Sequence, residues 1–226
     1  MDRLPDPDER ERLAMVAEQI AARGVADPRV LAALRRVPRH LFVPAGLRHH
    51  AHEDRPLPIG LQQTISQPYI VGYMTEALHL RGGERVLEIG TGCGYQTAVL
   101  AEVVGPGGRV VSLEIVSELH QRAQDLLARL DVTNVELHAA DGSAGWPAAA
   151  PYDAILVTAA PATVPPALEQ QLAPGGRLLL PVGDCWQELV LIERRPDSRL
   201  LRIPLLAVSF VPMTGAVRDG GKPGGG

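Results

Sequence analysis

Residues 85–104, RVLEIGTGCGYQTAVLAEVV, carry the clearest structural signal in this 226-residue chain. A short apolar run leads into three alternating glycines, Gly90, Gly92 and Gly94, and a segment with helical spacing of apolar residues follows. A strand that turns through glycines into a helix is typical of the first unit of a doubly wound α/β sheet, which binds its ligand at the carboxyl edge of its strands. A tight turn alone does not need three glycines. We therefore interpret this stretch as a ligand-binding loop.

Six further short apolar runs follow this loop, and helical patterns separate the earlier ones. The runs span residues 109–115, 135–140, 152–158, 176–183, 188–195 and 205–212, and the helical patterns span 95–104, 117–130 and 163–172. Near-continuous apolar strands that alternate with helices indicate a parallel sheet covered on both faces. The last run is expected to pair antiparallel at one edge. The predicted fold is therefore α/β, with a doubly wound, mostly parallel, seven-stranded Rossmann-like sheet.

The first part of the chain has a different pattern, which predicts a helical extension. Apolar residues recur at helical spacing over 8–23, and Gly24 ends that helix. Asp27 and Pro28 have the residue types of an N-cap and a first helical position, and they predict the start of a second helix. Residues 68–80 predict a third.

These patterns divide the chain into three parts. We expect an N-terminal helical segment, 1–80, which packs on the core and contributes a substrate cleft. A ligand-binding core, 81–219, follows, and a glycine-rich flexible tail occupies 220–226. The hydrophobic fraction of 46% is enough for the sizeable core that this organisation requires.

Charge and composition argue against several classes of function. The net charge of −4 disfavours a nucleic-acid partner or an anionic membrane surface, and we interpret the arginine-rich run 35–40 as a solvated helix end. No apolar run reaches the roughly 18 residues of a membrane-spanning helix, and the N-terminus is too charged for a signal peptide. Cys93 and Cys185 lie far apart, which indicates a reduced, cytoplasmic protein. The histidine cluster 49–52 lacks the ligand spacing of a metal site, so no metal is expected.

The glycine loop narrows the choice of ligand. A dinucleotide fingerprint would need a third glycine where Tyr95 stands, and a P-loop would need a Gly-Lys-Ser/Thr sequence, which is absent. The loop contains no Lys or Arg, and Glu88 lies just before it. An acidic entrance suits a positively charged ligand better than a pyrophosphate. S-adenosylmethionine, which carries a sulfonium and an amino group but no phosphate, fits this pattern.

Two further acidic residues follow the next two predicted strands. Glu114 ends the second strand, where a carboxylate can accept hydrogen bonds from both ribose hydroxyls of a cofactor. Asp141 and Gly142 follow the third strand, where a side chain can meet the adenine. Each acid alone is typical of a solvated turn. Together with Glu88, at the ends of three successive strands, they indicate one cofactor site.

Six segments resemble, in order, the bacterial protein-L-isoaspartate O-methyltransferases, a family of class I S-adenosylmethionine-dependent methyltransferases. They are ADPRVLAALRRVPRHLFVP, DRPLPIG, QTISQPYIVGYMTEAL, VLEIGTGCGYQTAVLAEV, YDAILVTAA and LAPGGRLLLPVG. The resemblance extends over about residues 10–215, and the TISQP sequence joined to the glycine loop makes it specific.

The resemblance implies methyl transfer to the free carboxylate of an L-isoaspartyl residue in a damaged protein. The ester then closes to a succinimide, whose hydrolysis returns some normal aspartate. The resemblance also implies Ser66 as the active-site residue, with Gln63 and Thr64 lining the cleft. Cofactor contacts are implied at Thr91, within the glycine loop, and at Thr214. Isoaspartyl-containing proteins and peptides are the expected partners, and we expect a monomer.

The segment 61–70, LQQTISQPYI, is rich in hydrogen-bonding side chains but contains no acid or base. A substrate carboxylate, with a pKa of about 4, is already ionised at neutral pH. It therefore needs placement in line with the methyl group rather than a general base. The neutral hydroxyls of Thr64 and Ser66 can hold it without a tight ion pair. A simple N-capping role for the helix after Pro68 is the alternative, and the two roles are compatible.

Other possibilities stay open at the level of sequence. Gln62 stands where many members have glycine, and His52 where tyrosine is frequent; the larger Gln62 bears on peptide preference rather than on chemistry. A methyltransferase for a dedicated biosynthetic peptide and an inactive cofactor-binding interaction module are the alternative functions. The β-rich run 208–212 is the candidate for backbone pairing with an extended peptide, and an ordinary edge strand is the alternative.

Overall fold

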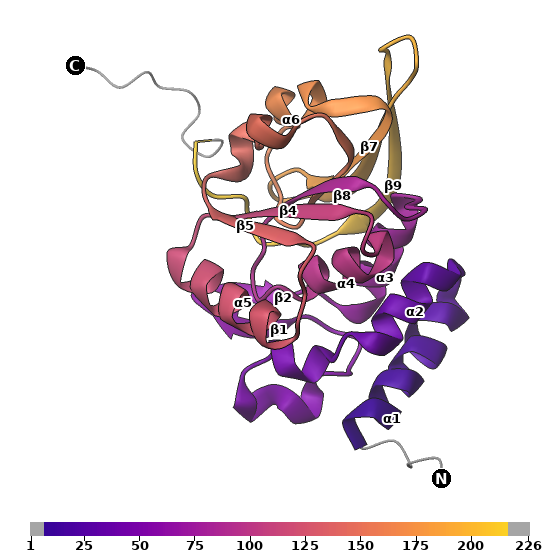
Figure 1. Ribbon diagram of the computed structural model, residues 1–226, viewed down its shortest axis with the longest axis vertical. Helices are drawn as coiled ribbons and strands as arrows, with labels where there is room; N and C mark the ends of the chain where they lie inside the picture. Colours follow the sequence, from indigo (N-terminus) through magenta and orange to yellow (C-terminus); the bar gives the residue numbers. More distant parts are fainter. Residues whose placement is uncertain (1–6, 217–226) are drawn as a thin grey trace, which may run out of the picture.

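The computed structural model describes residues 7–216, so the predicted flexible tail at 220–226 lies outside the described residues. Seven strands form one sheet in the order β5-β4-β3-β6-β7-β8-β9 (Figure 1). They are β3 (Arg85–Ile89), β4 (Arg109–Glu114), β5 (Val135–Ala139), β6 (Tyr152–Val157), β7 (Leu172–Val182), β8 (Gln187–Arg194) and β9 (Leu200–Val208). Adjacent strands from β5 to β7 pair parallel. β8 pairs antiparallel with β7, and β9 pairs antiparallel with β8. The predicted seven-stranded, mostly parallel sheet is confirmed.

The edge strand β9 differs from the prediction at both ends. It pairs antiparallel with β8, as expected, but it spans Leu200–Val208 rather than 205–212. The segment that follows leaves the sheet because its backbone pairs elsewhere. The N–H of Ala160 donates to the carbonyl of Val211 at 2.8 Å, and the N–H of Met213 donates to the carbonyl of Ala160 at 2.8 Å. The C-terminal segment is thereby held beside the carboxyl end of β6.

Both faces of the large sheet are covered, which confirms the doubly wound arrangement. Val86 and Leu87 are adjacent on β3 and fully buried, yet they belong to separate hydrophobic clusters because successive strand side chains point to opposite faces. The helices that connect the strands pack on both faces: α4 and α5 contribute to the cluster of Val86, and α6 contributes to that of Leu87 through Leu168. The helices are α4 (Tyr95–Val104), α5 (Ser117–Arg129) and α6 (Pro166–Gln170).

The N-terminal region is helical, as predicted, but its first helix is not uniform. α1 (Pro7–Ala14) continues into a π-helical turn (Met15–Ile20) and a 3₁₀ turn (Ala21–Arg23). Gly24 then ends the helix with a φ of 100°, a left-handed conformation that glycine adopts without steric cost. Further 3₁₀ turns lie at Arg39–Phe42, Ala45–His50, Gly142–Ala144 and Pro147–Ala149.

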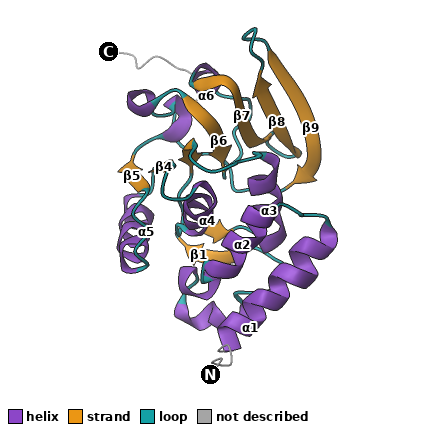
Figure 2. Ribbon diagram, turned by 45° about the vertical axis from the view of Figure 1, so that its right-hand side comes forward, coloured by secondary structure: helices purple, strands orange, loops and turns teal. Residues whose placement is uncertain are grey.

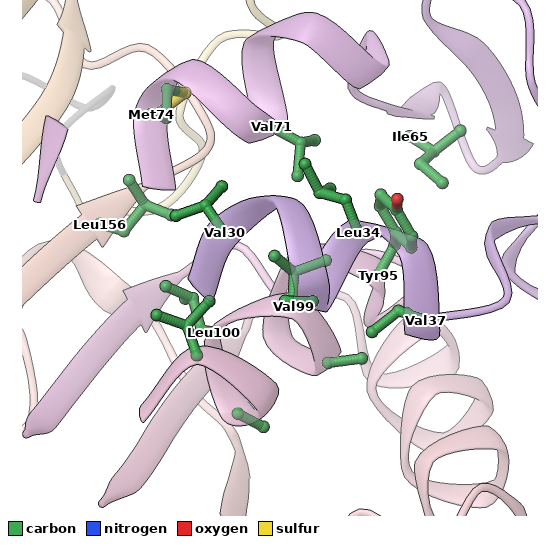
Figure 3. Packing of buried hydrophobic residues seen from close by; sticks show 14 of the residues in the cluster. Val30, Leu34, Val37, Ile65, Val71, Met74, Tyr95, Val99, Leu100 and Leu156 are labelled. Atoms are coloured by element: carbon green, nitrogen blue, oxygen red, sulfur yellow. The ribbon is translucent and has the colours of Figure 1, made fainter. Parts of the chain in front are cut away.

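The second and third helices attach this extension to the core. α2 (Pro28–Arg36) begins as predicted, because the carboxylate of Asp27 accepts hydrogen bonds from two backbone N–H groups of the first turn, at 2.8 and 3.2 Å. Its apolar side, which includes Val30 and Leu34, belongs to the same cluster as residues of α4 and of α3 (Pro68–Ala77). Figure 3 shows side chains from these helices gathered in that cluster. The helical extension and one face of the sheet therefore share a hydrophobic core.

The arginine-rich run 35–40 is not a solvated helix end throughout. The side chain of Arg36 is exposed and pairs with Glu102, as a solvated position predicts. Arg39, in the 3₁₀ turn after α2, is fully buried. The interpretation of the run as solvated is therefore wrong for Arg39, because its turn folds inward beneath the segment that contains Ser66.

Candidate active site

A cleft of about 830 Å³ lies at the carboxyl edge of the parallel strands. Its walls are the segments at the ends of β3, β4, β5 and β6, together with residues 63–66 and 211–214. Residues 63–65 form β2 (Gln63–Ile65), which pairs with β1 (Leu57–Gly60) in a small sheet apart from the large one (Figure 2). The predicted cleft between the 61–70 segment and the glycine loop is confirmed, at the edge where ligands of such sheets bind.

Most of the predicted site residues line this cleft. They are Gln63, Thr64, Ser66, Gly90, Thr91, Gly92, Glu114, Gly142 and Thr214. Two predicted residues, Glu88 and Asp141, do not line it. Both exceptions are acids whose carboxylates bind groups of the protein itself.

The glycine loop brings backbone rather than side chains to the cleft. Gly90 and Gly92 have φ values of 95° and 57°. A Cβ atom on Gly90 would lie 2.4 Å from Oγ1 of Thr158, which leaves no space for a side chain. The conformation and the close approach both require glycine at this position. Gly90 and Gly92 both line the cleft, where neither has a side chain to separate its backbone from a ligand.

Glu114 is held at the end of β4 by two backbone N–H groups. Its Oε2 accepts a hydrogen bond from Gly92 at 2.8 Å, and its Oε1 accepts one from Val116 at 2.9 Å. It is the only charged side chain among the described residues that line the cleft. Each carboxylate oxygen keeps a second acceptor position. The predicted contact with two ribose hydroxyls is therefore compatible with these bonds.

Glu88 lies beneath the loop instead of at its entrance. Its side chain is fully buried, and Oε2 accepts hydrogen bonds from the hydroxyls of Thr97 at 2.5 Å and Ser112 at 2.6 Å. The prediction of a direct cofactor contact is wrong, because the side chain points from β3 into the interface with α4. Burial raises the pKa of Glu88 to about 7. The hydroxyls of Ser112 and Thr91 are 2.6 Å apart, so Glu88 connects to the loop through them.

The carboxylate of Asp141 binds two backbone N–H groups of the protein. Its Oδ1 accepts a hydrogen bond from the N–H of Ser143 at 2.9 Å, and its Oδ2 accepts one from the N–H of Ala216 at 2.8 Å. The carboxylate thus holds the chain just beyond Thr214, which lines the cleft. Asp141 does not itself line the cleft, whereas its neighbour Gly142 does, and the adenine contact of the Asp141 side chain stays a prediction.

Thr158 is a site residue that the sequence reasoning missed. Its hydroxyl donates to the carbonyl of Gly90 at 2.7 Å, and its N–H donates to that of Ile89 at 2.9 Å. It follows β6 directly, so the rule that located Glu114 and Gly142 at strand ends could have found it. Thr158 links the fourth strand end to the glycine loop.

The opposite wall is a tight hairpin. Gly60 pairs with Gln63, so Leu61 and Gln62 form a two-residue turn. Their φ values of 53° and 60° are those that a type I′ turn requires. Gln62 is exposed and lies outside the residues that line the cleft. The turn directs Thr64 and Ser66 toward the glycine loop.

The helix after this hairpin is not capped by the segment itself. Gln67 occupies the N-cap position of α3 but makes no side-chain capping bond. Its Nε2 donates to the carbonyl of Asp54 at 3.0 Å and to Oδ2 of Asp54 at 2.8 Å. Asp54 Oδ1 instead accepts from the N–H of Tyr69, at 3.2 Å. The alternative that this segment caps α3 with its own side chains is therefore wrong. Asp54 supplies the acceptor for the first turn of the helix, and Gln67 anchors the segment to Asp54.

A second hollow of about 1320 Å³ adjoins the cleft. The turn between β7 and β8 and residues 207–211 supply much of its lining. Four residues line both hollows, namely Thr64, Ser66, Thr158 and Val211. All four have uncharged side chains. The cleft and the second hollow therefore meet at a neutral junction that contains two of the predicted hydroxyls.

The sheet and the glycine loop at its carboxyl edge define the Rossmann-like fold of the S-adenosylmethionine-dependent methyltransferases. The family model described as protein-L-isoaspartate(D-aspartate) O-methyltransferase matches residues 10–218. The chain belongs to this family.

Curated relatives and solved structures agree with this assignment. A protein-L-isoaspartate O-methyltransferase of Methanoculleus marisnigri is 55% identical over 212 residues, 93% of this chain and 94% of the relative. One of Picosynechococcus sp. is 52% identical over 214 residues, 95% of each chain. A solved protein-L-isoaspartate O-methyltransferase superposes with a TM-score of 0.84 at 30% identity, over 92% of this chain and 67% of that one. A Plasmodium falciparum protein solved with S-adenosyl-L-homocysteine shares the fold, with a TM-score of 0.77 at 23% identity over 90% of this chain and 98% of that one.

Proposed function

We propose that this chain transfers a methyl group from S-adenosylmethionine to the free carboxylate of L-isoaspartyl residues in damaged proteins, and that Ser66 positions that carboxylate. The observation that carries the proposal is the junction of the two hollows. Thr64 and Ser66 line both of them, so a cofactor in the cleft and a peptide in the second hollow would meet at these hydroxyls. The resulting ester can close to a succinimide, which begins repair.

The lining of the cleft fits S-adenosylmethionine. Gly90 and Gly92 line the cleft, and Glu114 offers acceptors for ribose hydroxyls. Glu114 also complements the positive charge of the cofactor, and no Lys or Arg side chain lies among the described residues of the lining. A pyrophosphate would lack a cationic partner at this site.

The reaction needs placement more than proton transfer. When bound, S-adenosylmethionine supplies a methyl group that its sulfonium makes electrophilic. The chain must hold an already ionised carboxylate in line with that methyl group. The hydroxyls of Thr64 and Ser66 can donate hydrogen bonds to the carboxylate, and the neutral junction leaves its charge available for attack. No general base is required, which accounts for the absence of an acid or base in the 61–70 segment.

Peptide recognition is proposed along the end of β9 and the residues after it. An enzyme that acts on many damaged proteins should read backbone, and an extended peptide beside an edge strand provides such pairing. The backbone N–H and carbonyl of Phe210 bind the side chain of Gln187, at 2.6 and 3.0 Å. Pairing with substrate would therefore use Ser209 and the N–H of Val211, since the carbonyl of Val211 already accepts a hydrogen bond from Ala160. We expect substitutions there, such as Ser209→Pro, to raise the KM for peptide.

The test is an assay with purified protein, labelled cofactor and two peptides that differ only in an isoaspartyl or a normal aspartyl residue. Label should pass to the isoaspartyl peptide alone and tolerate shuffled flanking residues. Equal transfer to both peptides would contradict isoaspartyl recognition. Activity with only one flanking sequence would favour the dedicated-peptide alternative, and binding of S-adenosylhomocysteine without any transfer would favour the interaction module.

We propose that the protein acts in the cytoplasm as a monomer. Within residues 7–216 no helix combines the length and apolar character needed to cross a membrane. Cys93 and Cys185 are both free thiols in the structure, as a reducing compartment favours. Light scattering of the purified protein should give the mass of one chain, and a dimer mass at micromolar concentration would contradict this proposal.

A further inference from the structure

Arg39 is a fully buried cation outside the residues that line the cleft. Its Nε donates to the carbonyl of Ala51 at 2.7 Å, and its Nη2 donates to the carbonyl of Ser66 at 2.7 Å. Its guanidinium carbon lies 4.8 Å from the ring centroid of Tyr95. Three segments that are distant in the sequence therefore meet at one side chain.

Burial of this charge is costly because no ion pair compensates it. Among the described residues, no carboxylate lies within salt-bridge distance of Arg39, and its Nη1 has no hydrogen-bond partner. Burial lowers the pKa of Arg39, although a guanidinium remains protonated in proteins at neutral pH. A buried aliphatic side chain would stabilise this position at lower cost. The arrangement is therefore better suited to fixing a conformation than to maximising stability.

The contacts of Arg39 join the two sides of the cleft. Ser66 belongs to the wall that is proposed to hold the substrate carboxylate. Tyr95 is the first residue of α4, directly after Gly94, and it lines the cleft from the side of the glycine loop. Phe42, three residues after Arg39, packs edge-on against the same ring with centroids 5.5 Å apart. The turn that carries Arg39 thus rests on the start of α4 while its guanidinium binds the backbone of Ser66.

We propose that Arg39 is a positioning residue for methyl transfer, which fixes the main chain of Ser66 at a set distance from the glycine loop through its hydrogen bond to the Ser66 carbonyl and its contact with Tyr95. This inference rests on the proposed role of Ser66. A small shift of Ser66 would misalign the carboxylate with the methyl group, and in-line reactions lose rate steeply with misplacement. Glu114 and Gly92, the proposed cofactor contacts, bind each other and not Arg39, so cofactor affinity should be largely independent of Arg39.

Arg12 provides a matched control for the loss of a buried arginine. It is 8% exposed, and its Nε donates to the carbonyl of Arg35 at 2.6 Å. It lies outside the lining of both hollows. Arg12→Met and Arg39→Met each remove a buried charge together with its hydrogen bonds to backbone carbonyls, one for Arg12 and two for Arg39, but only Arg39→Met affects Ser66.

The experiment compares kcat, the KM for an isoaspartyl peptide, the Kd for S-adenosylhomocysteine and the Tm of the two variants. Arg39→Met should lower kcat by about 10- to 100-fold, with the Kd for S-adenosylhomocysteine changed by less than about threefold. Arg12→Met should lower the Tm but change kcat by less than about twofold. Arg39→Lys, which keeps a charge and can reach one carbonyl, should recover part of the lost kcat. Equal losses of kcat in Arg39→Met and Arg12→Met would overturn the proposal.

A double-mutant cycle with Ser66→Ala separates this inference from the role of Ser66 itself. If Arg39 acts through Ser66, then Arg39→Lys or Arg39→Met should lower kcat much less in the Ser66→Ala background than in the wild type. The same fold loss in both backgrounds would overturn the Arg39 proposal and leave the role of Ser66 intact. Full activity of Ser66→Ala would instead overturn the role of Ser66. If neither Arg39 variant folds, Arg39 is a structural residue and the positioning role is rejected.

Discussion

The two walls of the cleft are built in different ways. The wall proposed to bind the cofactor, called here the cofactor wall, consists of Gly90–Gly92, Glu114, Gly142 and Thr158. Hydrogen bonds between neighbouring strand ends join Glu114 to Gly92 and Thr158 to Gly90. The wall proposed to bind the substrate, the substrate wall, consists of residues 63–66 and is held from outside the sheet. Arg39 binds the carbonyl of its last residue, and Asp54 anchors the residue that follows.

This difference shows where precision in the site comes from. The geometry of the cofactor wall follows from the parallel strands β5, β4, β3 and β6, whose ends supply its residues, so single side-chain losses should change affinity more than alignment. The substrate wall is a short hairpin whose position depends on a few buried polar contacts. Changes there should affect the chemical step while the cofactor still binds.

The largest expected effect concerns Glu88, beneath the cofactor wall. Its folded pKa of about 7 exceeds the ordinary value of 4.5, so the unfolded chain binds fewer protons than the folded one between these values. Stability should therefore fall as the pH rises from about 4.5 to about 7 and level off above, by at most about 3 kcal/mol. Glu88→Gln should remove this part of the pH dependence, as measured by urea unfolding at pH 5 and pH 8.

Glu118→Gln is the control for this measurement, because Glu118 is an exposed residue of α5. It should leave the pH dependence of the wild type in place. If Glu88→Gln and the wild type lose the same free energy of unfolding between pH 5 and pH 8, Glu88 is not the group responsible for the pH dependence. The buried acid beneath the cofactor wall would then not make stability sensitive to pH.

Ser66→Ala tests the substrate wall. Loss of one hydrogen bond to a charged carboxylate is worth about 2 kcal/mol, so kcat should fall by about 10- to 100-fold. Calorimetry with S-adenosylhomocysteine should show nearly unchanged affinity, because the hydroxyl is proposed to bind the substrate and not the cofactor. A loss of cofactor affinity as large as the loss of kcat would contradict the proposal that the two walls bind different ligands.

Glu114→Ala is the corresponding change in the cofactor wall. It removes the acceptors for Gly92 and Val116 as well as those proposed for the ribose, so the affinity for S-adenosylhomocysteine should fall by about 1–3 kcal/mol. At saturating cofactor, kcat should recover most of the wild-type value. Tighter binding of NAD than of S-adenosylhomocysteine by the wild type would refute the assignment of this wall.

The smallest effect is expected at the turn of the substrate wall. Gln62 has a φ of 60°, which costs a residue with a Cβ atom about 1 kcal/mol relative to glycine. Gln62→Gly should raise the free energy of unfolding by about that amount without changing kcat/KM. Gln121→Gly, within α5, is a control of opposite sign and should lower it by about 1 kcal/mol. A change in peptide preference in Gln62→Gly would show that the turn contacts substrate after all.

Much of the fold could be predicted because its signals are local. Asp27 caps α2, Gly24 ends the preceding helix, and α4 spans the predicted residues 95–104. Thr158 could have been included, since it stands at a strand end like Glu114. Side-chain periodicity, caps and glycine conformations act over a few residues, so they can be recognised in a sequence without knowledge of the packing.

The positions of site residues were predictable, but the directions and partners of several side chains were not. Parallel strands bring their carboxyl ends to one edge, which places Glu114 and Gly142 together from their order in the chain alone. By contrast, Asp141 binds Ala216 across 75 residues, and Arg39 binds Ser66 across 27. A buried hydrogen bond forms only where packing brings donor and acceptor within about 3 Å and excludes water. Such distances depend on the whole folded chain, and no local pattern of residues encodes them.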